Sequence, residues 1–294
     1  MMTTPMTSGR VLITGASTGI GEACARRLDA AGWHVFAGVR RDEDAARLRA
    51  ALSGRATPVL LDVTDESSIA RAAQIVRSTG DSDGGLDALV NNAGIAVAGP
   101  LEYLPIADIR RQLEVNVVGQ LAVTQACLPM LRLRRGRLVL MGSIAGRLTL
   151  PFLGPYSASK QALEALADAL RVELQPWDMP VVLLEPGSIA TPIWGKGAAD
   201  AQRMAGTYDK AARTRYGAAI AKVQDAAAAA ARRGIHPDEV ARVVERALTS
   251  RNPRPRYVVG RDARLQLFVR AIPDRLRDRL LTRGIGLPAR GSQR

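Results

Sequence analysis

The sequence contains little of the material from which metal centres, disulfide frameworks and membrane spans are built. Its two cysteines, Cys24 and Cys127, are too few and too far apart for a disulfide framework. Its two histidines, His34 and His236, stand alone, so we predict no zinc or other metal site. No apolar run approaches the roughly 18 residues that a membrane-spanning helix needs, and residues 1–9 do not resemble a signal peptide. These absences predict a cytoplasmic protein.

Lysine is scarce as well, and its placement is informative. The chain contains 37 Arg but only four Lys, namely Lys160, Lys196, Lys210 and Lys222. Arginine therefore serves almost wherever a plain positive charge is sufficient. A lysine ammonium is more compact than a guanidinium, and its pKa shifts more readily. We infer that Lys160, four residues after Tyr156, stands where such a tunable ammonium is needed.

Tyr156 and Lys160 are spaced for joint acid–base chemistry. Side chains four residues apart on a helix lie about 5–6 Å from each other. A free tyrosine has a pKa near ~10, and a neighbouring ammonium favours the phenolate and lowers that pKa. Ser143, upstream of the pair, would add a hydroxyl aimed at the same oxygen. We predict a proton relay that makes or breaks an alcohol O–H bond, although Tyr-x-x-x-Lys by itself also arises by chance.

The net charge of +13 is concentrated at one end of the chain. Residues 251–294 contain twelve Arg and three Asp, which leaves a balance of +4 for the preceding residues. No helix-turn-helix or RNA-binding signature accompanies this charge. We therefore predict no nucleic-acid partner.

Short apolar runs alternate with helical patterns along the chain. Strands are predicted at residues 11–13, 34–39, 59–63, 89–90, 138–141, 181–185 and 257–259. Helices are predicted from Ile20 onward, at 66–77, as one long helix over 107–131, at 157–174 and at 237–248. This alternation predicts a doubly wound α/β fold of the Rossmann type, with a parallel sheet and helices on both faces.

A glycine-rich turn follows the first strand directly. It reads Thr14-Gly15-Ala16-Ser17-Thr18-Gly19-Ile20-Gly21 and leads into a helix. Glycines let the backbone approach a pyrophosphate, and the helix N-terminus offers free N–H groups. Three glycines in isolation could be a tight turn, but this position favours a dinucleotide site. The predicted cofactor contacts here are Gly15, Ser17, Thr18, Gly19, Ile20 and Gly21.

The end of the second strand indicates which dinucleotide binds. In such folds an acidic residue at this point hydrogen-bonds the ribose 2′-OH of NAD, whereas an arginine accommodates the 2′-phosphate of NADP. The acidic position falls on Val39, and Arg40 and Arg41 follow. A guanidinium can bind a phosphate bidentately. We predict that NADP(H) is preferred over NAD(H), the alternative being that both arginines are solvated loop residues.

Several other polar or glycine-containing segments follow predicted strands. They are Asp62, Asn92, Ser143 and Pro186-Gly187. Ligands of parallel sheets bind beyond the carboxyl ends of the strands, so these segments are predicted to meet at one site.

Taken together, these motifs resemble the short-chain dehydrogenase/reductase family over about residues 10–260. The resemblance rests on TGASTGIG at 14–21, Asp62-Val63, NNAG at 91–94, Asn116, Ser143, Tyr156, Lys160, Pro186-Gly187 and Thr191. It implies that Tyr156 is the catalytic acid/base, that Ser143 binds the substrate oxygen, and that Lys160 holds the nicotinamide ribose. Asn116 would anchor a water relay to Lys160. The further cofactor contacts that it implies are Asp62, Val63, Asn92, Ala93, Gly94, Tyr156, Lys160, Pro186, Gly187, Ile189 and Thr191.

The stretches GLDALVNNAGIAVAGPLEYL and GPYSASKQALEALADALRVEL are most similar to the family branch that acts on retinols, steroids and similar apolar alcohols. We therefore expect an NADP(H)-dependent oxidoreductase that interconverts an apolar alcohol and its ketone or aldehyde, assembled as a homo-oligomer. One alternative is an epimerase or dehydratase, which would usually carry TGxxGxxG and lack NNAG. The other is a nucleotide-sensing binding protein, for which a broken tetrad would be expected.

The remaining segments flank the predicted catalytic domain of residues 10–260. Residues 1–9 are predicted to be a disordered leader. Residues 192–235, rich in Ala and Gly, are predicted to form a lid over the substrate, with a surface helical pair as the alternative.

Residues 261–294 form a basic amphipathic extension, interrupted by Pro273. We favour packing of this extension on the domain, because most basic amphipathic stretches are solvated faces of soluble proteins. The alternatives are that it covers the substrate mouth, meets another subunit or rests on a membrane surface.

Overall fold

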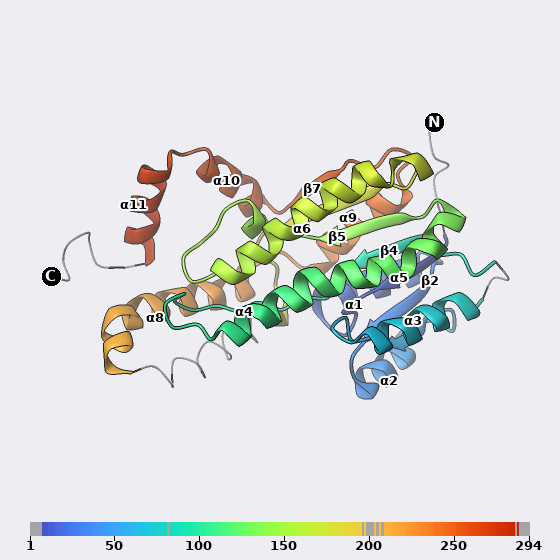
Figure 1. The fold of residues 1–294 in the computed structure, drawn as a ribbon, viewed down its shortest axis with the longest axis horizontal. Coiled ribbons are helices and arrows are strands. Elements are labelled where there is room, and N and C mark those ends of the chain that lie inside the picture. Colours follow the sequence, from blue (N-terminus) through green and yellow to red (C-terminus); the bar gives the residue numbers. More distant parts are fainter. Residues whose placement is uncertain are drawn as a thin grey trace.

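The computed structural model describes residues 8–80, 83–195, 197, 203, 206, 209–285 and 287. Its strands are β1 Arg10–Ile13, β2 His34–Val39, β3 Thr57–Leu60, β4 Ala88–Asn91, β5 Arg137–Met141, β6 Val181–Pro186 and β7 Arg256–Val259. They form one parallel sheet in the order β3-β2-β1-β4-β5-β6-β7 (Figure 1). The predicted doubly wound α/β fold is confirmed.

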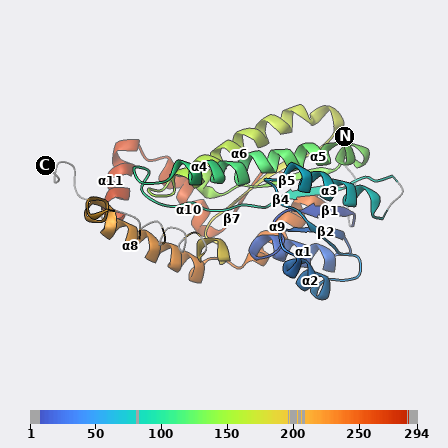
Figure 2. The same cartoon turned by 60° about the horizontal axis from the view of Figure 1, so that its bottom comes forward.

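Helices cover both faces of this sheet. The helices of the described residues are α1 Gly19–Ala30, α2 Asp42–Ala51, α3 Glu66–Ser78, α4 Ile106–Leu113, α5 Gly119–Arg134, α6 Gly154–Glu173, α8 Lys210–Arg233, α9 Pro237–Thr249, α10 Arg261–Arg270 and α11 Asp274–Ile285. The apolar faces of α1, α2 and α9 pack on one side of the sheet, and those of α3, α5 and α6 pack on the other. Figure 2 shows the two helical layers with the sheet between them.

The chain reverses its direction across the sheet at β1. It runs outward from β1 through β2 to β3, then crosses back to pair β4 with the other side of β1, where Leu12 lies opposite Phe36 and Leu89. The carboxyl ends of strands on either side of such a reversal leave a crevice for ligands. The glycine-rich turn, at the end of β1, therefore lies at this crevice.

Two local predictions are wrong in detail, and one helix was missed. The third strand ends at Leu60, not Val63, because the Asp62 carboxylate accepts hydrogen bonds from the backbone and hydroxyl of Thr64 and turns the chain. The predicted single helix over 107–131 is interrupted by a π-helical turn, Glu114–Val118. Helix α2, with three acidic residues in its first turn, was not predicted at all.

A short backbone pairing brings together the two ends of the segment predicted as a lid. Ile189 and Ile235 form an isolated parallel bridge, in which Ala190 N–H donates to the Ile235 carbonyl at 3.0 Å. Helix α8 lies within this segment, and part of the predicted lid falls outside the described residues. The lid function stays a prediction.

The basic extension forms two helices, α10 and α11, on either side of Pro273. In Figure 1 both lie at the same end of the molecule as α8, beyond the helices that cover the sheet. Only Ala263 of these helices is fully buried, so the favoured packing on the domain accounts for a small part of this extension. Within the described part of the chain, no helix has the length and apolar character needed to cross a bilayer.

Candidate active site

A cavity of about 560 Å³ opens at the carboxyl ends of the strands. It brings together all but two of the residues predicted for the site. Those that line it are Gly15, Ser17, Thr18, Gly19, Ile20, Arg40, Asp62, Val63, Asn92, Ala93, Gly94, Ser143, Tyr156, Lys160, Pro186, Gly187, Ile189 and Thr191. The two exceptions, Gly21 and Asn116, are buried behind its wall.

The glycine-rich turn has the geometry that a dinucleotide phosphate group requires. Gly15 and Gly19 have φ angles of +65° and +60°, which side chains other than glycine rarely adopt. A Cβ on Gly21 would lie 2.2 Å from the Gly15 carbonyl, so this glycine lets α1 pack directly against the turn. The Thr18 side chain does not cap α1 and instead lines the cavity. Free N–H groups at the N-terminus of α1 therefore fit a pyrophosphate.

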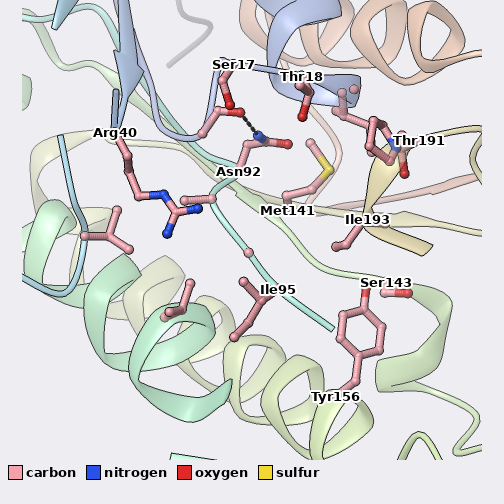
Figure 3. Close-up of a pocket in the computed structure, with 18 of the residues that line it drawn as sticks. Ser17, Thr18, Arg40, Asn92, Ile95, Met141, Ser143, Tyr156, Thr191 and Ile193 are labelled. Atoms are coloured by element: carbon pink, nitrogen blue, oxygen red, sulfur yellow. Dashed lines mark hydrogen bonds between the residues drawn. The ribbon is translucent and has the colours of Figure 1, made fainter. Parts of the chain in front are cut away.

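Asn92 holds the glycine-rich turn in place. Its side-chain amide donates to the carbonyls of Thr14 and Gly15, at 3.0 and 3.1 Å, and Figure 3 draws one of these two bonds. In return, the Thr14 hydroxyl accepts hydrogen bonds from the backbone N–H groups of Asn92 and Ala93, both at 2.9 Å. The predicted cofactor residue Asn92 thus joins the ends of β1 and β4.

Asn116 lies in the π-helical turn, where the helix widens. Its side chain accepts from Ile95 N–H at 2.9 Å and donates to the Ile95 carbonyl at 3.0 Å and to the Ser159 hydroxyl at 3.1 Å. Single π-helical turns often occur at functional sites, because they shift side chains out of the regular helical register. Asn116 therefore links the loop after β4 to α6, the helix that carries Tyr156 and Lys160.

Tyr156 and Ser143 meet at one end of the cavity. Helix α6 begins at Gly154, so Tyr156 lies in its first turn rather than just before it, and its side chain is buried. Its hydroxyl lies beside the hydroxyl of Ser143, which follows β5 (Figure 3). Lys160 lies one turn further on, with Nζ at 5.7 Å from the Tyr156 ring centroid. The Lys160 ammonium donates to the Met141 carbonyl at 2.7 Å.

Burial has opposite effects on the pKa values of the two groups. The pKa of Tyr156 lies above its ordinary value, because burial raises it and Ser143 offsets only part of that rise. Burial lowers the pKa of Lys160 from 10.5 to about 8, because the charged ammonium loses hydration. The predicted lowering of the tyrosine pKa by Lys160 is wrong for this structure, because the pKa of Tyr156 lies above its ordinary value and Lys160 is not among the groups that lower it. A lysine pKa close to neutrality is typical of functional lysines.

A partly buried ion network supports this end of the cavity from behind. Glu185, at the end of β6, is 1% exposed and accepts from Arg147 Nε at 2.6 Å and from Arg256 Nη1 at 3.1 Å. Glu164 of α6 pairs with the same two arginines, at 3.1 and 3.2 Å. The network joins α6, β6, β7 and the turn after Ser143, so it fixes the relative positions of Ser143 and Tyr156.

Arg40 and Arg41 are in different environments. Arg40 follows β2 and extends into the cavity between the glycine-rich turn and the helices opposite it (Figure 3). Arg41 is not among the lining residues, and its guanidinium pairs with Asp44 at 3.0 Å. Of the two predicted arginines, Arg40 alone is placed to meet a bound nucleotide.

Sequence reasoning missed several residues at the site. Trp194 lines the cavity and its ring meets the Tyr156 ring edge-on, with centroids 6.2 Å apart. Arg110 and Arg111 of α4 line the cavity as well. Arg47 of α2 donates to the Ser17 carbonyl in the glycine-rich turn. Trp194 could have been found as a large aromatic in an Ala- and Gly-rich segment, but nothing local marks the arginines in an Arg-rich chain.

Asp262 connects the C-terminal extension to the cavity. This residue of α10 accepts a hydrogen bond from Ser188 N–H at 2.7 Å. A Cβ on Gly187 would lie 2.5 Å from its carboxylate, and one on Gly260 would lie 2.6 Å from it. The carboxylate therefore fills the space that two glycines leave open, and it holds the loop after β6, of which Pro186, Gly187 and Ile189 line the cavity. We infer that Asp262 positions this loop.

We expect Asp262→Ala to raise the Kd of NADPH about tenfold, because a hydrogen bond to a charged acceptor contributes about 1.5–3 kcal/mol. Fluorescence titration with NADPH measures this effect. Asp262→Asn keeps an acceptor oxygen and should lie between wild type and Asp262→Ala. The matched control is Asp274→Ala, which removes an exposed aspartate paired with Arg277 in the same extension. A Kd for Asp262→Ala within twofold of wild type would remove Asp262 from this role.

Known proteins are similar in sequence to most of this chain. A family model described as short chain dehydrogenase matches residues 9–202. The chain belongs to the short-chain dehydrogenase family. It is therefore an oxidoreductase that acts on CH–OH groups, and the predicted family is confirmed.

Relatives within the short-chain dehydrogenase family match nearly the whole chain. An NADPH-dependent 3-dehydrocapnine reductase from Ornithobacterium rhinotracheale is 36% identical, over 92% of this chain and 94% of its own. Retinol dehydrogenase 5 from Homo sapiens is 36% identical, over 97% of this chain and 91% of its own. The predicted similarity to the retinol and steroid dehydrogenase branch is thus confirmed. A solved short chain dehydrogenase from Burkholderia cenocepacia in complex with NADP has a TM-score of 0.70 and 25% identity, covering 96% of this chain and 98% of that one.

Proposed function

We propose that this protein is an NADP(H)-dependent oxidoreductase that interconverts an apolar alcohol and its ketone or aldehyde. The observation that carries the proposal is that the Ser143 and Tyr156 hydroxyls lie side by side in the wall of the cavity that also contains the glycine-rich turn and Arg40 (Figure 3). A nucleotide-sensing protein would not need an acid/base pair at the far end of its nucleotide site. An epimerase or dehydratase is disfavoured by the NNAG and TGASTGIG motifs.

Different residues of the cavity bind the cofactor and transfer the proton. The N–H groups at the start of α1 hold the pyrophosphate, and Arg40 binds the 2′-phosphate. Lys160 holds the ribose hydroxyls with the donors that the Met141 carbonyl does not use. Bound NADPH supplies the hydride for reduction. Ser143 and Tyr156 hydrogen-bond the substrate oxygen, and Tyr156 donates the proton that completes the alcohol.

The preference for NADP(H) has support from the chain and from its relatives. Val39 stands at the position where an NAD-binding site would carry a carboxylate, and Arg40 follows it into the cavity. The Ornithobacterium relative is named as NADPH-dependent, and the Burkholderia structure contains NADP.

The surroundings of Tyr156 favour an apolar substrate. Tyr156 packs with Ala96 and Ala145, and Ile193 lies against this cluster. The Trp194 ring adds a further apolar wall. A cavity with such a lining favours the binding of hydrocarbon surface over the binding of charged groups. The match to retinol dehydrogenase 5 is consistent with such a substrate.

Helix α8 supports the lid interpretation. Tyr216 of α8 donates a hydrogen bond to Glu102 at 2.9 Å, and its ring lies edge-on to both Tyr103 and Phe152 at 6.0 Å. These contacts hold α8 against the loops that precede α4 and α6. The hydrogen bond to Glu102 is exposed to solvent, and segments held by exposed polar contacts open at low free-energy cost, as a lid requires.

The test is a panel of apolar ketones and aldehydes assayed for NADPH consumption by the purified protein. We expect turnover with at least one member of the panel, and slower turnover with NADH at equal concentration. Tyr156→Phe serves as the blank for adventitious reductases. Consumption at the same rate with wild type and this variant would contradict the proposal. The expected homo-oligomer is part of the same proposal, and analytical ultracentrifugation of the purified protein tests it.

A further inference from the structure

Helix α10 carries a stripe of arginine and apolar side chains that the domain does not cover. Arg261, Arg264, Leu265 and Phe268 follow the spacing i, i+3, i+4, i+7, so they share one face of the helix. Leu265 is 66% exposed and Phe268 is 74% exposed. Large apolar side chains rarely remain so exposed next to each other on a helix unless something covers them.

Helix α11 repeats the pattern. Leu276, Arg279, Leu280 and Arg283 have the same spacing on one face, and both leucines are 50% exposed. We call these eight side chains the C-terminal basic face. Helix α11 packs against α8, so the face lies beside the proposed lid (Figure 1).

A second cavity, of about 1070 Å³, extends the positive charge of this face. Arg261 and Arg264 line it, together with Arg233 and Arg246. Its two acidic residues are already engaged, since Glu239 pairs with Arg242 and Asp262 accepts from Ser188 N–H. None of these four arginines forms an ion pair with another described residue. The cavity is therefore suited to anionic groups such as phosphates.

We propose that the C-terminal basic face docks on the surface of a bilayer that contains anionic phospholipid. Leucine and phenylalanine side chains would enter the boundary between headgroups and acyl chains, and the arginines would meet the lipid phosphates. Residues 251–294 carry twelve Arg against three Asp, which matches the negative potential of such a surface. The Arg-lined cavity beside α10 provides room for headgroups.

A second copy of the chain is a poorer occupant. In a two-fold symmetric contact the same patch meets itself, so the arginines of one basic face would lie against those of the other. Like charges brought together in this way oppose association. An anionic bilayer neutralises the same arginines and still covers the apolar side chains.

If the proposed function also holds, docking has a consequence for substrate supply. Because α11 packs against α8, a docked protein would place the proposed lid close to the bilayer, in which apolar alcohols and ketones dissolve. The docking proposal itself does not depend on the reaction. Vesicle binding is measured without substrate, so its failure and the failure of the proposed function are distinguishable.

The full-length protein is tested by co-sedimentation with vesicles of phosphatidylcholine alone and with vesicles containing about one-third phosphatidylglycerol. We expect partitioning at least about tenfold stronger on the anionic vesicles, because each basic residue near the surface adds to the attraction. High salt should reduce the difference, because the attraction is screened. Equal or undetectable binding to both kinds of vesicle overturns the proposal.

Two pairs of variants locate the surface. Leu265→Glu with Phe268→Glu should reduce binding to anionic vesicles at least about tenfold. Its control, Ile75→Glu with Leu133→Glu, places the same charges at exposed apolar positions on α3 and α5. Arg264→Gln with Arg279→Gln should reduce binding about fivefold or more, whereas Arg49→Gln with Arg77→Gln removes the same charge from α2 and α3. NADPH titration and melting temperature establish that each variant is folded.

Two outcomes contradict the assignment of the surface. The first is equal loss of binding in the test and control variants, which would show a response to net charge alone. The second is that the wild type fails to bind vesicles while Leu265→Glu with Phe268→Glu lowers its mass in light scattering. That result would assign the face to contact between subunits.

Discussion

Replacement of Tyr156 by Phe should lower turnover at least ~10²-fold and leave the affinity for NADPH nearly unchanged. In the proposed mechanism the phenol hydroxyl, which lies beside Ser143, supplies the proton for the substrate oxygen, whereas the ring, which fills a buried position, is retained. Steady-state kinetics with any active ketone measure turnover, and fluorescence titration measures NADPH binding. Tyr257→Phe, which removes a hydroxyl that accepts from Arg254 N–H in another part of the chain, is the matched control. Turnover of Tyr156→Phe within a few-fold of wild type would remove Tyr156 from the mechanism.

The pH profile separates the contribution of Lys160 from that of Tyr156. Burial lowers the pKa of Lys160 to about 8, so the ammonium is present below that pH and is lost as the pH rises through it. The profile of kcat/KM for reduction reports on groups of the free enzyme, so it should fall above about pH 8. Lys160→Met should bind NADPH more weakly, turn over more slowly and show no fall at this pH. A loss confined to binding, with an unchanged pH profile, would contradict the role of the ammonium beside Tyr156.

Exchange of the residues at the end of β2 should reverse the cofactor preference. In Val39→Asp with Arg40→Leu, a carboxylate becomes available for the ribose 2′-OH and the guanidinium that faces the cavity is lost. A hydrogen bond to a charged group contributes about 1.5–3 kcal/mol, so loss of the Arg40 contact should weaken NADPH binding about tenfold to a hundredfold. The new carboxylate would also repel the 2′-phosphate. Titration of the wild type and of this double variant with NADPH and NADH measures the reversal.

Arg41→Leu is the matched control for this exchange. Its guanidinium pairs with Asp44 outside the cavity, so the ratio of the two cofactor affinities should remain that of the wild type. If the wild-type protein binds NADH as tightly as NADPH, Arg40 does not read the 2′-phosphate and the assignment fails. Equal effects of Arg40→Leu and Arg41→Leu would indicate a general effect of positive charge.

Most of the fold could be predicted because its signals are local. Apolar runs such as Val11–Ile13 must be buried on both faces of a sheet, and a helical pattern between consecutive runs predicts parallel pairing. The glycine-rich turn and the Tyr156–Lys160 spacing are local as well. The third strand and the long helix were harder to predict. In the first, an aspartate side chain competes with the backbone for hydrogen bonds, and in the second, a π-helical turn is held by contacts with distant residues.

The sequence by itself determined the doubly wound sheet and most of the residues that meet at its carboxyl edge, because strand period, glycine spacing and side-chain chemistry are encoded within short segments. Only the tertiary structure decided which residues line the cavity and which hold the backbone around it in place. Asn116 and Asp262 act on Ile95 and Ser188, and no local pattern records such pairs because the partners are far apart in the chain. The tertiary structure also decided that Phe268 and its neighbours remain exposed, because burial depends on which other elements reach a helix face, and only Ala263 on α10 is fully covered.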